Sequence, residues 1–219
     1  MALVDELIED GWLKTPEIIA AFRKIKRADF MPEGMKHLAE INEALPIGSG
    51  QTISQPLTVA FMLEELKPEA GDKILDVGSG SGWTTTLLAY IVSQKGNSKF
   101  QISNYKQKGK VIAIELLPEL KEFGEKNASK YNFVKKGIAE FICADGSKGY
   151  EKEAPFDKIL CSAAVQQNEI PLAWKKQLKI GGRIVAPVRS SIWTLVKKSE
   201  KEFEEAEYPG FGFVPLVQK

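Results

Sequence analysis

The sequence predicts an α/β fold built on a doubly wound, mostly parallel sheet of seven strands, with helices before it and an antiparallel C-terminal edge. From residue 73 onward, short apolar runs alternate with helical stretches, which is the order expected when helices cover a parallel sheet. A glycine-rich turn also joins the first apolar run directly to a helix. In such sheets, ligands bind in the crevice beyond the carboxyl ends of the strands.

Five apolar runs are the predicted parallel strands: 74–77, 111–114, 141–143, 159–161 and 184–188. Helices are predicted between them at 83–92, 117–131 and 171–177. Two β-rich segments, 193–197 and 211–217, are expected to pair as the antiparallel edge. The connection 93–110 exceeds the usual length of about 2–6 residues and is predicted to be a loop or small hairpin with a lysine-bearing surface.

The N-terminal third is predicted to be mainly helical. Val4, Leu7 and Ile8 recur at helical spacing. In the second helix, 17–26, Thr15 is the expected N-cap, with proline at the first helical position. A third helix, 57–66, is opened by proline, and the stretch 45–50 before it is expected to be a glycine-rich loop.

Composition excludes several classes of protein. Thirty Lys and Arg against 29 Asp and Glu leave a net charge of +1, so no strong field indicates a nucleic acid or an anionic membrane as the main partner. Cys143 and Cys161 cannot form a disulfide framework, and the single histidine, His37, excludes histidine-rich zinc sites and HExxH motifs. We expect both cysteines to be buried and inert, and His37 to be a surface or capping residue.

The N-terminus predicts a soluble protein. It is acidic and amphipathic, whereas a signal peptide is basic and then apolar. No apolar stretch approaches the roughly 18 residues of a membrane span. A cytoplasmic location is therefore expected.

The turn that follows the first strand is the main candidate site. Gly78, Gly80 and Gly82 form a GxGxG pattern, which lets the backbone approach a ligand and aims a helix N-terminus at the strand end. This spacing differs from the GxGxxG of dinucleotide-binding proteins, and a simple tight turn is the alternative. Glu115 ends the next strand, where ribose hydroxyls need an acceptor, and Asp145 follows the third strand, where it could accept from an exocyclic amine. The ordered set predicts a nucleoside-binding crevice.

The same order of motifs resembles the S-adenosylmethionine-dependent methyltransferases of the Rossmann-like class I. Upstream, Gly50-Gln51-Thr52-Ile53-Ser54-Gln55-Pro56 is similar to the signature of the protein-L-isoaspartate (D-aspartate) O-methyltransferase family. Further stretches that resemble the family are 25–32, 45–48, 154–159, 177–183 and 213–216, so the likeness covers nearly the whole chain.

The resemblance implies a single methyltransferase domain, 1–219, with N-terminal helices and an acceptor loop in 1–70, a cofactor-binding core in 71–190 and C-terminal strands in 191–219. It implies methyl transfer from S-adenosylmethionine to L-isoaspartyl residues of damaged proteins, with D-aspartyl residues as a further substrate. We expect a monomer that binds neither nucleic acid nor membrane. The implied cofactor-binding residues are Asp76, Gly78, Ser79, Gly80, Ser81, Glu115, Leu116, Asp145 and Gly146. The implied substrate-binding residues are Thr52, Ile53, Gln55 and Val214, with Ser54 as the catalytic residue.

The chemistry fits a chain with few catalytic groups. An isoaspartyl α-carboxylate is already ionised at pH 7, so alignment with the methyl group can replace a general base. Ser54 is expected to donate to one carboxylate oxygen. Alternatively, Thr52 and Ser54 cap the helix that follows. Trp83 is expected to flank the cofactor or to belong to the core.

The chain also departs from the family pattern. Ser49 stands where histidine is frequent, Glu40 where an aromatic residue is usual and Ala144 where glycine is usual, and 93–110 looks inserted. Three other functions are weighed: a methyltransferase acting on RNA or a small metabolite, a silent peptide-binding module and a nicotinamide oxidoreductase. The GxGxG spacing disfavours the last, and Cys161-Ser162-Ala163-Ala164 lacks the Asn/Asp-Pro-Pro-aromatic motif of many RNA enzymes.

Overall fold

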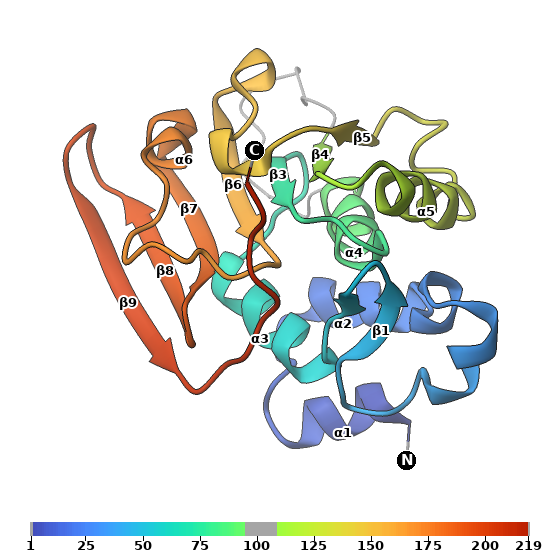
Figure 1. Ribbon diagram of the computed structural model, residues 1–219. Coiled ribbons are helices and arrows are strands. Elements are labelled where there is room, and N and C mark those ends of the chain that lie inside the picture. Colours follow the sequence, from blue (N-terminus) through green and yellow to red (C-terminus); the bar gives the residue numbers. More distant parts are fainter. Residues whose placement is uncertain (1, 95–108, 219) are drawn as a thin grey trace.

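A mixed sheet forms the centre of the molecule (Figure 1). The computed structural model describes residues 2–94 and 109–218, and within them seven strands follow the order β5-β4-β3-β6-β7-β8-β9. These strands are β3 (Lys73–Val77), β4 (Lys110–Glu115), β5 (Ala139–Cys143), β6 (Phe156–Cys161), β7 (Leu178–Val188), β8 (Ser191–Lys197) and β9 (Phe203–Pro209). The predicted α/β fold is confirmed.

Strand β3 is the point at which the winding of the sheet reverses. It pairs in parallel with β4 on one side and with β6 on the other, so that Val77 lies beside both Ile114 and Cys161. The chain then adds β5 beyond β4, and β7 beyond β6. The connection after β3 leads to β4, whereas the connection after β6 leads to β7. The two connections therefore leave the carboxyl edge in opposite directions, which is where α/β sheets open a ligand crevice. Strands β8 and β9 are antiparallel, as predicted for the edge.

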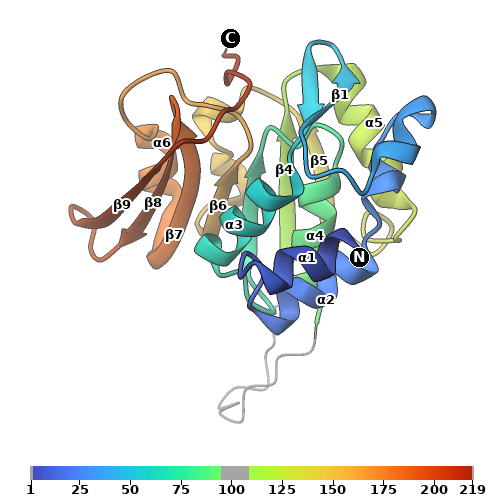
Figure 2. The same cartoon turned by 90° about the horizontal axis from the view of Figure 1, so that it is seen from below.

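Helices cover the two faces of the sheet unequally. The helices are α1 (Leu3–Glu9), α2 (Pro16–Lys24), α3 (Pro56–Leu66), α4 (Trp83–Val92), α5 (Pro118–Ser129) and α6 (Leu172–Gln177). Alternate side chains of β3 enter different cores: Ile74 packs in the core that α1 to α5 share, and Leu75 packs in the core that holds Trp174 of α6. Figure 2 shows α1 and α2 lying outside α4, as an additional layer over one face.

The predicted loop at 45–50 is wrong. It belongs to a hairpin of β1 (Leu45–Gly48) and β2 (Gln51–Ile53), in which Leu45 and Ile47 are buried in alternation. Ser49 and Gly50 reverse the chain with φ angles of 50° and 69°, the positive values that a tight hairpin turn requires. The proline and glycines suggested a loop, but here they end and turn the strands.

The second strand of the C-terminal edge is also misplaced by the sequence prediction. β9 occupies 203–209, where three exposed glutamates obscure the strand pattern. The predicted strand 211–217 instead crosses the carboxyl edge of the sheet and makes a single parallel bridge, between Pro215 and Ala164. Pro215 has no N–H to donate to a regular ladder.

Several smaller predictions have mixed outcomes. Cys161 is buried as expected, but Cys143 is exposed at the end of edge strand β5, so the prediction of two buried thiols is wrong for Cys143. His37 is exposed on a 3-10 helix, Glu33–Leu38, as predicted. Most of the predicted 93–110 connection, residues 95–108, lies outside the described residues. In the described part of the chain, no helix is long and apolar enough to span a membrane.

Candidate active site

The glycine turn connects β3 to α4 and is held against the neighbouring strand. The backbone N–H groups of Gly78 and Ser79 both donate to the carbonyl of Ile114, at 2.8 and 3.1 Å. Gly82 follows at the N-cap of α4 with φ 81°, and a Cβ there would lie 2.5 Å from the carbonyl oxygen of Gly124. Only glycine allows both the left-handed backbone and this close approach of α5.

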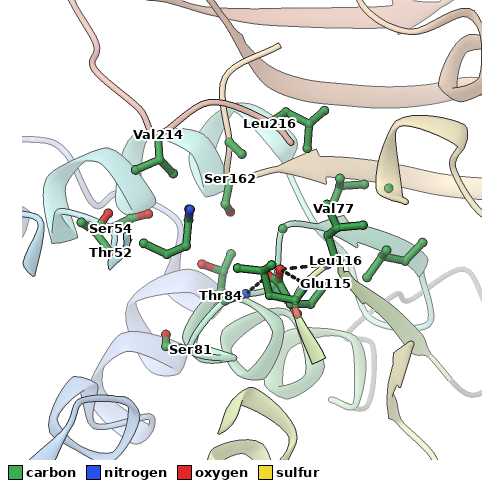
Figure 3. A pocket seen from close by; sticks show the side chains of 18 of the residues that line it. Thr52, Ser54, Val77, Ser81, Thr84, Glu115, Leu116, Ser162, Val214 and Leu216 are labelled. Atoms are coloured by element: carbon green, nitrogen blue, oxygen red, sulfur yellow. Dashed lines mark hydrogen bonds between the residues drawn. The ribbon is translucent and has the colours of Figure 1, made fainter. Parts of the chain in front are cut away.

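Glu115 is positioned by backbone donors from both sides of the turn. One of its carboxylate oxygens accepts from Gly80 N–H at 3.0 Å, and the other accepts from Leu116 and Leu117 N–H at 2.8 and 3.1 Å. The side chain is only 8% exposed but remains in the wall of the cavity (Figure 3). A carboxylate has about four lone-pair sites, so at least one remains for a ligand hydroxyl.

Asp76 lies beneath the turn rather than in the cavity wall. Its carboxylate is fully buried and accepts from the Thr85 hydroxyl at 2.6 Å. Burial, together with the nearby negative charge of Glu115, raises the pKa of Asp76 to about 7, although the Thr85 bond opposes this change. The predicted contact of Asp76 with the cofactor therefore stays a prediction, and its observed contact is structural.

The acceptor side combines the end of the hairpin with the C-terminal segment. Figure 3 shows Thr52 and Ser54 together at one side of the cavity, with Val214 beside them and Glu115 across the cavity. The carbonyl of Val214 accepts from Ala164 N–H, and Leu216 N–H donates to the Ala164 carbonyl, each at 2.8 Å. These two bonds hold the C-terminal segment over the carboxyl edge of the sheet.

The Ser54 hydroxyl makes no hydrogen bond to any part of the chain that the structure describes, and it lines the cavity. Gln55, not Ser54, is the N-cap residue of α3, and the first-turn N–H of Leu57 donates to the Asn42 side chain at 3.0 Å. The alternative that Thr52 and Ser54 serve as helix caps is therefore wrong. Ser54 is free to donate to a bound molecule.

The cavity brings together most of the predicted residues and encloses about 770 Å³ of empty space, including the part open to solvent. Its wall contains Thr52, Ile53, Ser54, Gly78, Ser79, Gly80, Ser81, Glu115, Leu116, Gly146 and Val214. Gln55 and Asp145 lie outside the wall. The amide of Gln55 donates to Asn42 and accepts from Thr58, and the Asp145 carboxylate accepts from the backbone and hydroxyl of Ser147.

Sequence reasoning missed the residues that follow β6. Ser162 and Ala163 line the cavity, and Ser162 N–H donates to the Val77 carbonyl at 2.9 Å. Their position after the fourth apolar run was the available signal, because the carboxyl ends of neighbouring parallel strands meet at one edge. Thr84 and Leu117 also line the cavity and were not predicted, although they directly follow Trp83 and Leu116, which were considered.

The residues present fit S-adenosylmethionine. Ser79 lines the cavity, and its hydroxyl is buried without a partner among the described residues, so it is available to a ligand. Glu115 supplies an acceptor suited to a ribose hydroxyl. At Gly146 a Cβ would lie 2.5 Å from a Val77 methyl group, so the absence of a side chain keeps this wall open.

Comparison with known proteins agrees with this site. The family model described as protein-L-isoaspartate(D-aspartate) O-methyltransferase matches residues 1–219. Proteins named protein-L-isoaspartate O-methyltransferase from Methanopyrus kandleri and Pyrococcus abyssi are 35% and 38% identical to the chain. Each alignment covers 98% of this chain, and 89% and 92% of those proteins respectively.

A solved structure shows the same fold. This Plasmodium falciparum protein, described as a protein-L-isoaspartate O-methyltransferase in complex with S-adenosyl-L-homocysteine, superposes with a TM-score of 0.83 at 21% identity. The superposition covers 99% of this chain and 97% of that one. The chain therefore belongs to the protein-L-isoaspartate(D-aspartate) O-methyltransferase family and is an enzyme.

Proposed function

We propose that this protein methylates the free α-carboxylate of L-isoaspartyl residues in damaged proteins, and that Ser54 orients that carboxylate. The observation that carries the proposal is the unpartnered Ser54 hydroxyl in the wall of the cavity, across from Glu115. The resulting methyl ester can close to a succinimide, whose hydrolysis returns some normal aspartate. The activity is thus a repair reaction.

On the cofactor side, we assign Glu115 to the ribose hydroxyls and Ser79 to a polar group of the cofactor. Three backbone donors fix the Glu115 carboxylate, so its direction is set before any ligand binds. Gly78, Gly80, Ser81 and Leu116 supply the remaining wall, and Gly146 leaves space for the base. S-adenosylmethionine supplies a methyl group on a sulfonium, whose leaving group departs uncharged.

On the acceptor side, the chain needs to align the substrate and not to activate it. A carboxyl group with a pKa near 4 is ionised at pH 7, so no base has to remove a proton. Ser54 donates to one oxygen of the carboxylate and leaves the other directed at the methyl group. We assign Thr52, Ile53 and Val214 to contacts with the substrate peptide on the same side of the cavity.

Other nucleophiles of the chain do not compete for this role. Burial raises the pKa of the Cys161 thiol to about 12, with a smaller contribution from the negative charge of Asp76, so the reactive thiolate is scarce at neutral pH. His37 is exposed on a 3-10 helix that contributes no residue to the cavity wall. The proposal extends to D-aspartyl residues as substrates, to a monomeric enzyme and to a cytoplasmic location.

The test uses two peptides that differ only in the linkage at one aspartyl residue. Each is incubated with the full chain and radiolabelled S-adenosylmethionine, and base-labile methyl ester is counted. We expect label in the L-isoaspartyl peptide and none above background in the aspartyl peptide. Equal labelling of the two peptides, or labelling of neither, would contradict the proposal. A third peptide containing D-aspartate tests the extension separately.

A further inference from the structure

Arg27 is a buried cation that lies outside the cavity but is bonded to its acceptor side. It belongs to a 3-10 helix, Arg27–Phe30, between α2 and the hairpin, and it is 6% exposed. Its Nη1 donates to the carbonyls of Ala39 and Ile41, at 3.2 and 3.0 Å. Its Nη2 donates to the carbonyls of Glu43 and Ser54, at 2.7 and 3.2 Å.

These four bonds add to the contacts that join residues 39–43 to the segment after β2, where Gln55 and Leu57 also bond to Asn42. Residues 39–43 lead into β1, and Ser54 directly follows β2, so the guanidinium bridges the two ends of the hairpin. A planar guanidinium presents its donors in a fixed fork. The position of each carbonyl is therefore set relative to the other three, and the Ser54 backbone is held through its carbonyl, while its hydroxyl stays free.

Arg27 also contacts the first residue of α4. Its guanidinium carbon lies 5.5 Å from the centroid of the Trp83 ring, and Trp83 lies in the wall of the cavity directly after the glycine turn. Burial lowers the pKa of Arg27 to about 10, while the negative charge of Glu40 opposes the change. The group is therefore still a cation at neutral pH, and its bonds to the carbonyls are charge-assisted.

We propose that Arg27 is a positioning residue for methyl transfer. It fixes the position and orientation of the Ser54 backbone, so that the Ser54 hydroxyl can donate to the substrate carboxylate. It touches neither substrate nor cofactor. Its effect is exerted through the Ser54 carbonyl and through the segment 39–43 that precedes the hairpin. The activity readout of this inference rests on the proposed function, and a second readout is independent of it.

The experiment compares Arg27→Ala and Arg27→Lys with a control, Arg183→Ala. Arg183 also donates to a backbone carbonyl, that of Glu65 at 3.0 Å, but it lies on β7 away from the cavity. We expect kcat/KM for the isoaspartyl peptide to fall about 100-fold in Arg27→Ala. The dissociation constant for S-adenosylmethionine, measured by calorimetry, is expected to change less than about threefold. Arg27→Lys should recover little, because one ammonium cannot reach four separate carbonyls.

Added guanidinium ion provides a rescue test. A cavity with about 900 Å³ of empty space, including the part open to solvent, borders Arg27 and is lined in part by Phe22, Ile25 and Glu40, so removal of the side chain leaves a space that joins it. Millimolar guanidinium is expected to restore activity at least about fivefold in Arg27→Ala. The ion should have no such effect on Arg183→Ala or on the unmodified chain.

Hydrogen exchange gives the readout that does not depend on catalysis. In Arg27→Ala we expect faster amide exchange in residues 39–43 and 51–55, with α4 and β4 unchanged. Two results would overturn the inference: exchange in 51–55 equal to that of the unmodified chain, or a loss of kcat/KM no larger than in Arg183→Ala at a matched melting temperature. Absence of isoaspartyl methylation by the unmodified chain would count against the proposed function alone, since the exchange result would still decide the role of Arg27.

Discussion

The cofactor side and the acceptor side of the cavity are built in different ways. The cofactor side consists of two contiguous segments, 77–83 and 114–117, which lie next to each other because β3 and β4 are in parallel register. Its groups are fixed by backbone donors within these two segments. The acceptor side instead assembles 51–54, 162–163 and 214–217, which are far apart in the chain.

The cross-links that hold the acceptor side are few and specific. Two hydrogen bonds join the C-terminal segment to Ala164, and the four bonds of Arg27 join the ends of the hairpin. Damage to the cofactor side should therefore appear mainly in ligand affinity and in fold stability. Damage to the acceptor side should appear mainly in turnover, with cofactor binding preserved.

The largest effect is expected for Glu115→Ala. The variant loses the acceptor for the ribose and leaves the N–H groups of Gly80, Leu116 and Leu117 without their partner. We expect S-adenosylmethionine affinity to fall about 10³-fold, which corresponds to about 4 kcal/mol. Titration calorimetry checks this, with Glu122→Ala on the exposed surface of α5 as the control. Affinity within about threefold of the unmodified chain would remove Glu115 from the cofactor side.

Asp76 makes the stability of the cofactor side depend on pH. Its pKa is about 7 in the folded chain against an ordinary value of 3.8, mainly because of burial. Between these values the folded chain holds a proton that the unfolded chain has released, so raising the pH through this window lowers the free energy of unfolding. The linkage amounts to about 3 kcal/mol between pH 5 and pH 8.

Asp76→Asn removes this titration and keeps a similar shape. The pH dependence due to Asp72, whose pKa burial raises to about 6, is present in both chains and cancels in the comparison. Urea denaturation at several pH values is the measurement. The unmodified chain should lose about 3 kcal/mol relative to Asp76→Asn as the pH rises from 5 to 8. Parallel curves for the two chains would mean that Asp76 is ionised across the whole range.

Replacement of glycine by alanine should destabilise the fold more on the cofactor side than on the acceptor side. Gly82 and Gly50 both have positive φ, but only Gly82 has a backbone neighbour that an added Cβ would meet, at 2.5 Å. We expect Gly82→Ala to lower the free energy of unfolding by about 3 kcal/mol or more, and Gly50→Ala by about 1 kcal/mol. Chemical denaturation of both variants measures the difference. Equal losses would show that α5 can move away from the turn.

Ser54→Ala separates the two sides most directly. Its hydroxyl has no partner among the described residues, so its removal leaves the fold intact. We expect kcat to fall about 100-fold, with S-adenosylmethionine affinity within about twofold of the unmodified chain. Single-turnover kinetics on the isoaspartyl peptide, with Ser81→Ala as a comparison on the cofactor side, provide the test. A loss of cofactor affinity would instead assign Ser54 to the cofactor side.

The sequence predicted the two sides unequally for the same structural reason. Gly78, Gly80 and Glu115 could be predicted from the sequence. The two glycines follow one predicted strand, Glu115 ends the next one, and the parallel register of β3 and β4 brings them together. Ser54 and Val214 were predicted only through family resemblance, since no local pattern indicates that residues 160 positions apart meet. The four hydrogen bonds of Arg27 could not be predicted from the sequence either, because their acceptors are backbone carbonyls, which every residue carries.

The errors in the fold have local physical causes. Exposed glutamates on β9 removed the apolar alternation by which strands are recognised, and Pro46, Gly48 and Gly50 gave the hairpin the composition of a loop. Cys143 lies on an edge strand, where only one side of the sheet has a neighbouring strand, so an apolar run did not guarantee burial.

The smallest effect is expected at the hairpin tip, where a side chain of the hairpin bonds to α5. The Ser49 hydroxyl donates to Glu119 at 3.1 Å, in an exposed position, and Ser49 has φ 50°. Ser49→Ala loses the bond and keeps the backbone strain, so the free energy of unfolding should fall by about 0.5 kcal/mol. Ser49→Gly loses the bond but relieves the strain, and its stability should equal or exceed that of the unmodified chain.

The Ser49 pair also tests whether the two sides of the cavity act independently. If they do, both variants bind S-adenosylmethionine as the unmodified chain does, because the tip bond lies outside the cavity wall. Calorimetry on the two variants decides this. If affinity falls about tenfold in both, then the tip bond holds the hairpin over the glycine turn, where Ile47 already approaches Gly80. The hairpin of β1 and β2 would then contribute to the cofactor side as well as to the acceptor side. Only the C-terminal segment and Arg27 would then belong to the acceptor side alone.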